Sequence, residues 1–171
     1  MPPPPITNIR DYLPLAKVTV LQGYYVRDDA MALLNAVLPL TYDYATEYVT
    51  AVGDAFYGDL PEDTGPSWRS TLSIQDRERC VIALLASQYA ELELAIHVYL
   101  AVMEGMSPEE VANILMLTGM YAGLDAFSKG LRTEAKALAT LAALVDGNKP
   151  MDALSVLKTL KNVFEPPPPS P

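Results

Sequence analysis

The sequence predicts an all-α protein, and three observations support this fold class. Apolar residues between residues 28 and 164 recur mostly at the three- and four-residue spacing of helices, not in the alternation of strands. Ser107, Pro108 and Glu110 form a capping box with proline at the first helical position, which marks a helix start. The chain also lacks hairpin signals, strand–helix alternation and any repeat of fixed period.

The individual helices follow from these start and stop signals. We expect a short helix over 28–37 and a second that begins at Pro39 and ends near Tyr57. Residues 58–73 read as a loop, in which Trp68 anchors the loop to the core. Helical residues continue from 75 to 103, where Gly105 ends the run. Three more helices are expected: one from 107 to about 119–123, one over 124–145 and one over 151–164.

Proline-rich segments flank this helical region. The stretch PPPP at 2–5 and the stretch PPPPSP at 166–171 predict extended, polyproline-like tails. We therefore divide the chain into an N-terminal tail (1–9), one helical domain (10–164) and a C-terminal tail (165–171). The tails are expected to be solvated spacers, with docking into an aromatic groove of another protein as the alternative.

Charge and composition narrow the classes of partner. The net charge is −9 and the isoelectric point is near 4.5, so neither nucleic acid nor an anionic membrane is an expected partner. Half of the residues are hydrophobic, which suggests a surface buried against a partner protein. No apolar run approaches the ~20 residues of a membrane span, and residues 1–10 lack the pattern of a signal peptide, so we expect a cytoplasmic protein.

Cys80 is the only cysteine of the chain, which excludes an intramolecular disulfide and any cysteine-based zinc site. We expect it to be a buried packing residue, because free cysteines are commonly buried.

His97 is the only histidine, and two glutamates are placed to act with it. Glu93 precedes it by one helical turn. Glu78 could reach it only if the stretch 75–103 is not one rod, since 19 residues of helix would separate the two by about 28 Å. Ser87 can cap a new helix, and a turn there would bring Glu78 and His97 level on two antiparallel arms. We therefore predict a helical hairpin.

Residues 72–131 resemble the carboxymuconolactone decarboxylase family, whose superfamily includes the alkylhydroperoxidase D-like proteins. Three features carry the resemblance: D-R-x-R at Asp76–Arg79, E-L-x-x-H ending at His97, and G-x-S-x-E-E followed by Y-A-G-x-x-A. The resemblance implies an all-helical, alkylhydroperoxidase D-like fold. It also implies assembly into homo-oligomers, either trimers or hexamers, with active sites near the subunit contacts.

Two chemistries follow from this resemblance. The alkylhydroperoxidase D-like branch carries C-x-x-C-x-x-x-H, and both cysteine positions are replaced here, by Ala90 and Glu93. Peroxidase chemistry needs a thiolate, so an antioxidant function is disfavoured. The decarboxylase branch is closer, although the second histidine of many members is Leu117 here.

The resemblance implies a site built on His97, Glu93 and Glu78 that acts by acid–base catalysis on a small lactone or carboxylic acid. Arg77 or Arg79 would hold the substrate carboxylate, and Tyr121 would donate a hydrogen bond to a developing enolate. No cofactor or metal is expected, although His97 and the two glutamates offer a mixed ligand set as an alternative. The remaining alternative is a non-catalytic, oligomeric binding or scaffold protein.

Overall fold

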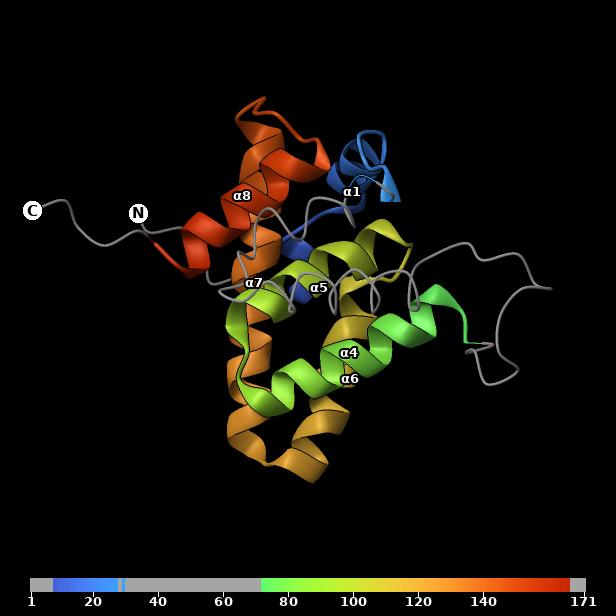
Figure 1. The fold of residues 1–171 in the computed structure, drawn as a ribbon, viewed down its shortest axis with the longest axis vertical. Helices are drawn as coiled ribbons and strands as arrows, with labels where there is room; N and C mark the ends of the chain where they lie inside the picture. The colour runs from blue at the N-terminus through green and yellow to red at the C-terminus, as the bar shows by residue number, and fades with distance from the viewer. Residues whose placement is uncertain (1–7, 28, 30–71, 167–171) are drawn as a thin grey trace, which may run out of the picture.

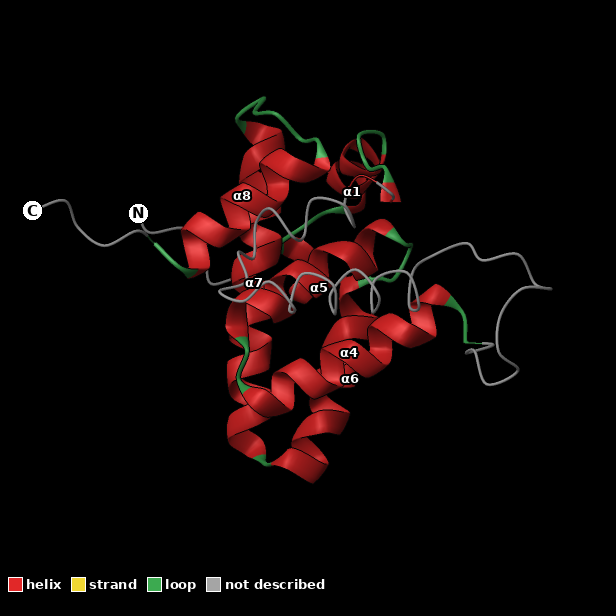
Figure 2. Cartoon of the chain, viewed as in Figure 1, coloured by secondary structure: helices red, strands yellow, loops and turns green. Residues whose placement is uncertain are grey.

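The computed structural model describes residues 8–27, 29 and 72–166, and within these ranges every regular element is a helix (Figures 1 and 2). The all-α prediction is therefore confirmed for the described part. The helices expected over 28–37 and 39–57 and the loop with Trp68 lie outside these residues. The elements in order are η1 (Ile9–Asp11), α1 (Leu15–Gln22), α4 (Ile74–Gln88), α5 (Glu91–Met103), α6 (Pro108–Ala122), α7 (Leu124–Asp146) and α8 (Ala153–Phe164).

Helix α5 lies at the centre of the fold. It contacts α4, α6, α7, α8 and α1, and Figure 1 shows it between α4 and α8. Its sequence, ELELAIHVYLAVM, is apolar on nearly every side after the first turn, which is the pattern of a helix that is buried all round. His97 is the exception, a polar residue within the run from Leu94 to Met103 that is otherwise buried.

The capping signals predicted for α6 are confirmed. The Ser107 hydroxyl accepts a hydrogen bond from the Glu110 amide, and the Glu110 carboxylate accepts one from the Ser107 amide. These bonds hold the pKa of Glu110 below its ordinary value, the Ser107 amide having the largest effect. Gly105 follows the end of α5 at φ 92°, a conformation that favours glycine, as expected at this position.

Helix α1 was not predicted from the sequence. Its segment, LAKVTVLQ, mixes β-branched and apolar residues without a clear helical stripe, and only Val18 and Leu21 are buried. Tertiary contacts hold it in place: the Gln22 side-chain amide donates to the carbonyl oxygens of Val102 and Met103 in the last turn of α5. Lys17 pairs with Asp146 at the end of α7 (2.6 Å).

Helices α6 and α7 form a hairpin whose backbones approach closely. A Cβ atom on Gly119 would lie 2.5 Å from Cβ of Phe127, so only glycine fits at this position. The connection turns at Gly123, whose φ of 99° also favours glycine. Helix α7 continues past this hairpin to pack on α5 and then on α8, and so it joins the two ends of the molecule (Figure 1).

Candidate functional site

The predicted helical hairpin exists, but its turn differs from the one expected. Helix α4 continues through Ser87 to Gln88, and the Ser87 hydroxyl donates to the Leu84 carbonyl oxygen within the same helix (2.7 Å), so Ser87 caps nothing. The chain turns at Tyr89, which has the left-handed conformation (φ 58°) in which glycine usually ends a helix. Sequence reasoning missed this turn because tyrosine rarely adopts that conformation.

Two backbone hydrogen bonds close the turn. The Tyr89 amide donates to the Ala86 carbonyl oxygen and the Ala90 amide donates to that of Leu85, which together form a Schellman motif. The second bond places Ala90, just before α5, beside Leu85, which lies nearly one turn before the end of α4. Glu78 lies seven residues before Leu85, and His97 lies seven residues after Ala90. Seven residues are nearly two helical turns, so both side chains return to the facing sides of their helices at the same level.

Glu78 and His97 therefore meet, as the hairpin predicts. The distance between His97 Nδ1 and Glu78 Oε2 is 2.9 Å. The Glu78 side chain is completely buried, whereas 16% of the His97 side chain remains exposed. Glu78 thus belongs to the interior, and the imidazole lies between it and the surface.

This contact determines what the imidazole can do. An ionised carboxylate only accepts hydrogen bonds, so with Glu78 ionised the shared proton is on Nδ1. The neutral ring then has its lone pair on Nε2, where it can act as a base. The pair is thus a carboxylate-oriented imidazole, an arrangement suited to proton transfer.

Glu93 is the third residue expected at the site. It is half-buried, one turn before His97 on α5, where its charge lies close to the positive end of the helix. No hydrogen bond or ion pair joins Glu93 to His97 within the described residues; the carboxylate in contact with the ring is that of Glu78.

The two arginines expected to clamp a substrate have protein partners instead. Arg79 pairs with Asp76 (2.6 Å) and, at 3.4 Å, with Glu110 of α6. Hydrogen bonds from Ser73, followed by that from Arg79, keep the pKa of Asp76 below its ordinary value. Arg77 donates through Nε to the Leu72 carbonyl oxygen (3.1 Å). Both arginines thus tie the start of α4 to its surroundings.

Tyr121 lies on a different surface from His97. Its side chain is 92% exposed and borders a hollow of about 610 Å³ between α4 and α6, whose lining contains neither His97 nor Glu78. Cys80 lines the same hollow and is exposed, so the prediction of a buried cysteine is wrong. Cys80 lies about 200° around α4 from Glu78, and the side of α4 away from α5 is open here.

A buried carboxyl group that sequence reasoning missed lies on α7. Glu134 is fully buried, and neither of its oxygens has a hydrogen-bond partner within the described residues. Burial raises the pKa of Glu134 from 4.5 to about 8. A signal was present in the sequence, since Glu134 falls in line with Gly130, Ala137 and Leu141 on the apolar stripe of its helix.

The described residues contain neither a metal-ligand cluster nor a membrane-crossing helix. No three His, Cys, Asp or Glu side chains gather there in a way that could hold a metal ion, so Glu78, Glu93 and His97 do not form a ligand set. None of the described helices combines the length and apolar character needed to cross a bilayer.

These observations define a class: a helical protein with a buried carboxylate that orients a histidine across a helical hairpin. Residues 62–135 match the model of the carboxymuconolactone decarboxylase family, which confirms the resemblance and assigns this segment of the chain to that family. The matched segment contains the whole α4–α5 hairpin, α6 and the first half of α7. Searches of curated proteins and of solved structures found no significant match.

Proposed function

We propose that this protein is a carboxymuconolactone decarboxylase-like catalyst that decarboxylates or isomerises a small lactone or carboxylic acid, with His97 as its acid–base group and Glu78 as the orienting carboxylate. The observation that carries the proposal is the 2.9 Å contact between His97 Nδ1 and the fully buried Glu78 carboxylate. A surface ion pair between the same residue types would not fix the imidazole in one orientation.

The chemistry needs one group that both takes and gives a proton near neutral pH. In isomerisation, His97 would remove a proton from carbon and return it at another carbon, which moves the double bond. In decarboxylation, it would protonate the carbon that loses carbon dioxide. General acid–base catalysis of this kind contributes roughly 10²–10⁴-fold to a rate. Glu93 lies one turn before His97 on α5 and completes the three residues assigned to the site.

The test is turnover of a panel of unsaturated lactone acids, followed by absorbance and by release of carbon dioxide. We expect His97→Gln to abolish turnover, and Glu78→Gln to reduce kcat by roughly 10²-fold or more, within the range of general acid–base catalysis. Glu91→Gln is the matched control, because Glu91 lies in the same first turn of α5 as Glu93 and is exposed. Turnover that survives His97→Gln would refute the assignment.

The chain has one imidazole, so NMR reports on the site directly. We expect the neutral ring of the wild type to carry its proton on Nδ1. In Glu78→Gln the amide can either donate to Nδ1 or accept from it, so the preference for this tautomer should weaken. A ring with its proton on Nε2 in the wild type would contradict the proposed base.

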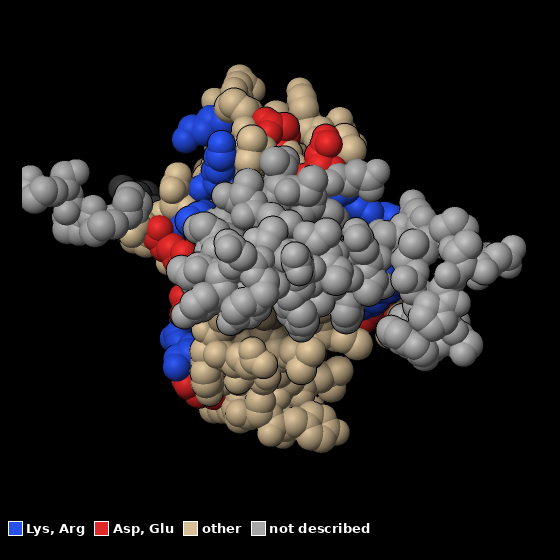
Figure 3. All heavy atoms as spheres, viewed as in Figure 1, with Lys and Arg blue, Asp and Glu red and all other residues tan. Residues whose placement is uncertain are grey.

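We also propose that the protein assembles into a homo-oligomer, a trimer or a hexamer as the family resemblance implies. The support is an apolar face at the end of the α6–α7 hairpin, where Figure 3 shows few charged atoms at the lower end of the molecule. Large apolar patches on a soluble protein commonly mark contact surfaces. The exposed apolar residues there are Met116, Leu117, Met120, Tyr121 and Leu124, together with Leu84 of α4.

Light scattering coupled to gel filtration tests this assembly. Met120→Lys should dissociate the oligomer, because it buries a charge in the contact. Leu15→Lys is the control, since Leu15 is as exposed (79%) but lies at the start of α1. A monomeric wild type would refute the assembly.

A further inference from the structure

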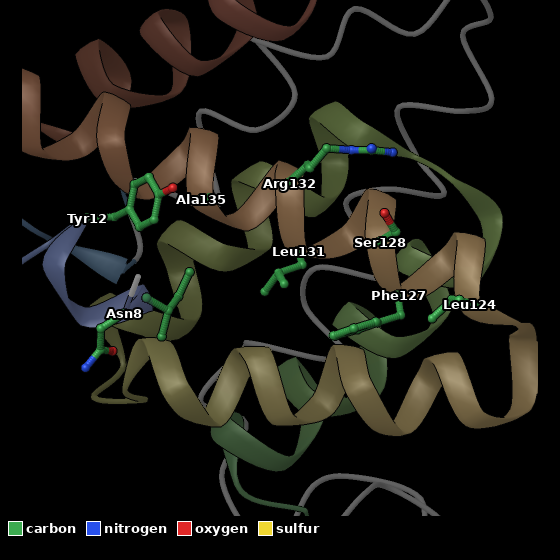
Figure 4. A pocket seen from close by; sticks show the side chains of 9 residues that line it. Asn8, Tyr12, Leu124, Phe127, Ser128, Leu131, Arg132 and Ala135 are labelled. Carbon is green, nitrogen blue, oxygen red and sulfur yellow. The ribbon is translucent and has the colours of Figure 1, made fainter. Parts of the chain in front are cut away.

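A second hollow lies between η1 and α7. Its volume is about 550 Å³, within the range of roughly 300–1,000 Å³ typical of small-molecule sites. Figure 4 shows it between η1 and α7. None of its residues belongs to the His97–Glu78 pair. Its lining consists of Asn8, Ile9, Tyr12, Leu124, Phe127, Ser128, Leu131, Arg132 and Ala135.

The walls of this hollow divide into an apolar part and a polar part. The apolar part includes Ile9 of η1 and Phe127 and Leu131 of α7, all of which are half-buried. Ser128 and Arg132 lie one turn apart on α7, so the hydroxyl and the guanidinium occupy the same side of the helix. The polar groups thus lie along one edge of an apolar surface.

The charge at this edge is positive. Arg132 forms no ion pair within the described residues, whereas the nearby Asp125 is paired with Lys129 (2.8 Å). In Figure 4 the Arg132 side chain extends along the outside of α7 past Ser128, not into the hollow. An exposed arginine changes rotamer within nanoseconds, so its guanidinium can fold over a ligand held beside Ser128.

We propose that this hollow is a second ligand site, which binds a small amphipathic carboxylate. The apolar body of the ligand would lie on Ile9, Phe127 and Leu131, and its carboxylate would meet Arg132 and the Ser128 hydroxyl. A single guanidinium suits a monoanion, and the net charge of −9 disfavours ligands with several negative charges. The site is separate from the proposed catalytic pair and does not depend on it.

Isothermal titration of the full chain with octanoate tests the proposal, and octanol serves as the neutral probe of matched length. We expect saturable binding of octanoate at one site per chain. Arg132→Gln should weaken it by about tenfold, and Ala135→Phe, which fills the hollow, should abolish it. Lys149→Gln is the control, because Lys149 is also an exposed cation without a hydrogen bond or ion pair in the described part.

The two arms of the experiment separate this site from other apolar surfaces. Octanol should bind more weakly than octanoate and should not respond to Arg132→Gln. Octanoate binding that persists unchanged in both Arg132→Gln and Ala135→Phe would place the ligand elsewhere, for example on the apolar face of α6, and would overturn the proposal. Absence of binding to the folded wild type would overturn it as well.

Discussion

Glu134 makes the stability of this protein depend on pH in a direction that can be stated in advance. Its carboxyl group is buried without a partner, and burial raises its pKa from 4.5 to about 8. The unfolded chain, where the group is solvated, loses this proton at lower pH than the folded protein does. The contribution of Glu134 to stability should therefore be most favourable below about pH 4.5, fall between 4.5 and 8, and stay low above that.

The size of this effect follows from the same two values. They differ by about 3.5 pH units, and each unit corresponds to about 1.4 kcal/mol, so the full loss is about 3–5 kcal/mol. This is a large part of the stability of an ordinary domain, which is roughly 5–15 kcal/mol. The loss should be nearly complete by pH 8 and small at pH 5.

Glu134→Leu removes the titrating group at nearly constant volume. We expect the variant to gain about 1–3 kcal/mol over the wild type at pH 5, where mainly an unpaired neutral acid is removed, and about 2–4 kcal/mol more than that at pH 8. Urea unfolding followed by circular dichroism at pH 5, 6, 7 and 8 measures this difference. Other titrating groups cancel between the two proteins.

The control for this experiment is Glu165→Leu, because Glu165 is exposed after the end of α8. The free energy of unfolding of Glu165→Leu should differ from that of the wild type by the same amount at every pH. The reasoning about Glu134 is refuted if the stabilities of Glu134→Leu and the wild type run parallel from pH 5 to pH 8.

Three further predictions concern backbone geometry, and thermal or urea unfolding tests each. Gly119→Ala should lower the free energy of unfolding by about 1–3 kcal/mol, because the new Cβ meets Cβ of Phe127. Gly130→Ala should lower it less, because the nearest neighbour there is the movable end of the Leu115 side chain. Equal losses in the two variants would contradict this. Ser107→Ala should cost about 1 kcal/mol through loss of the α6 cap, while Ser87→Ala should be nearly neutral. Tyr89→Val should destabilise by about 1–2 kcal/mol relative to Tyr89→Gly, since a β-branched residue resists the left-handed conformation; a valine variant as stable as the glycine variant would disprove this.

The sequence was most informative where local rules and tertiary packing agree. The α6 cap could be predicted because serine, proline and glutamate at those spacings satisfy amides within their own turn. The Glu78–His97 contact could be predicted from the family resemblance and a hairpin, even though the turn itself was misplaced at Ser87. Tyr89 adopts the left-handed conformation, which tyrosine disfavours, because the Schellman bonds and the packing of α5 on α4 hold it there.

The errors have a common physical origin, since each needed long-range information. Helix α1 is held by side chains that reach the ends of α5 and α7, which no local pattern shows. Cys80 is exposed because α4 and α6 leave a hollow beside it, although free cysteines are usually buried. Glu134 is the reverse case: its place on the apolar stripe of α7 indicates burial, but its lack of a hydrogen-bond partner among the described residues is visible only once α7 is packed.

The Ala90–Leu85 hydrogen bond has a consequence for how this scaffold can change its chemistry. Because positions 78 and 97 are each seven residues from that bond, the backbone alone brings them face to face, whatever side chains they carry. The facing pair can therefore be exchanged by two substitutions without rebuilding the fold. An inserted residue at the turn, in contrast, would rotate α5 by about 100° and separate any such pair. The length of this turn is thus under tighter constraint than the identity of the side chains at positions 78 and 97.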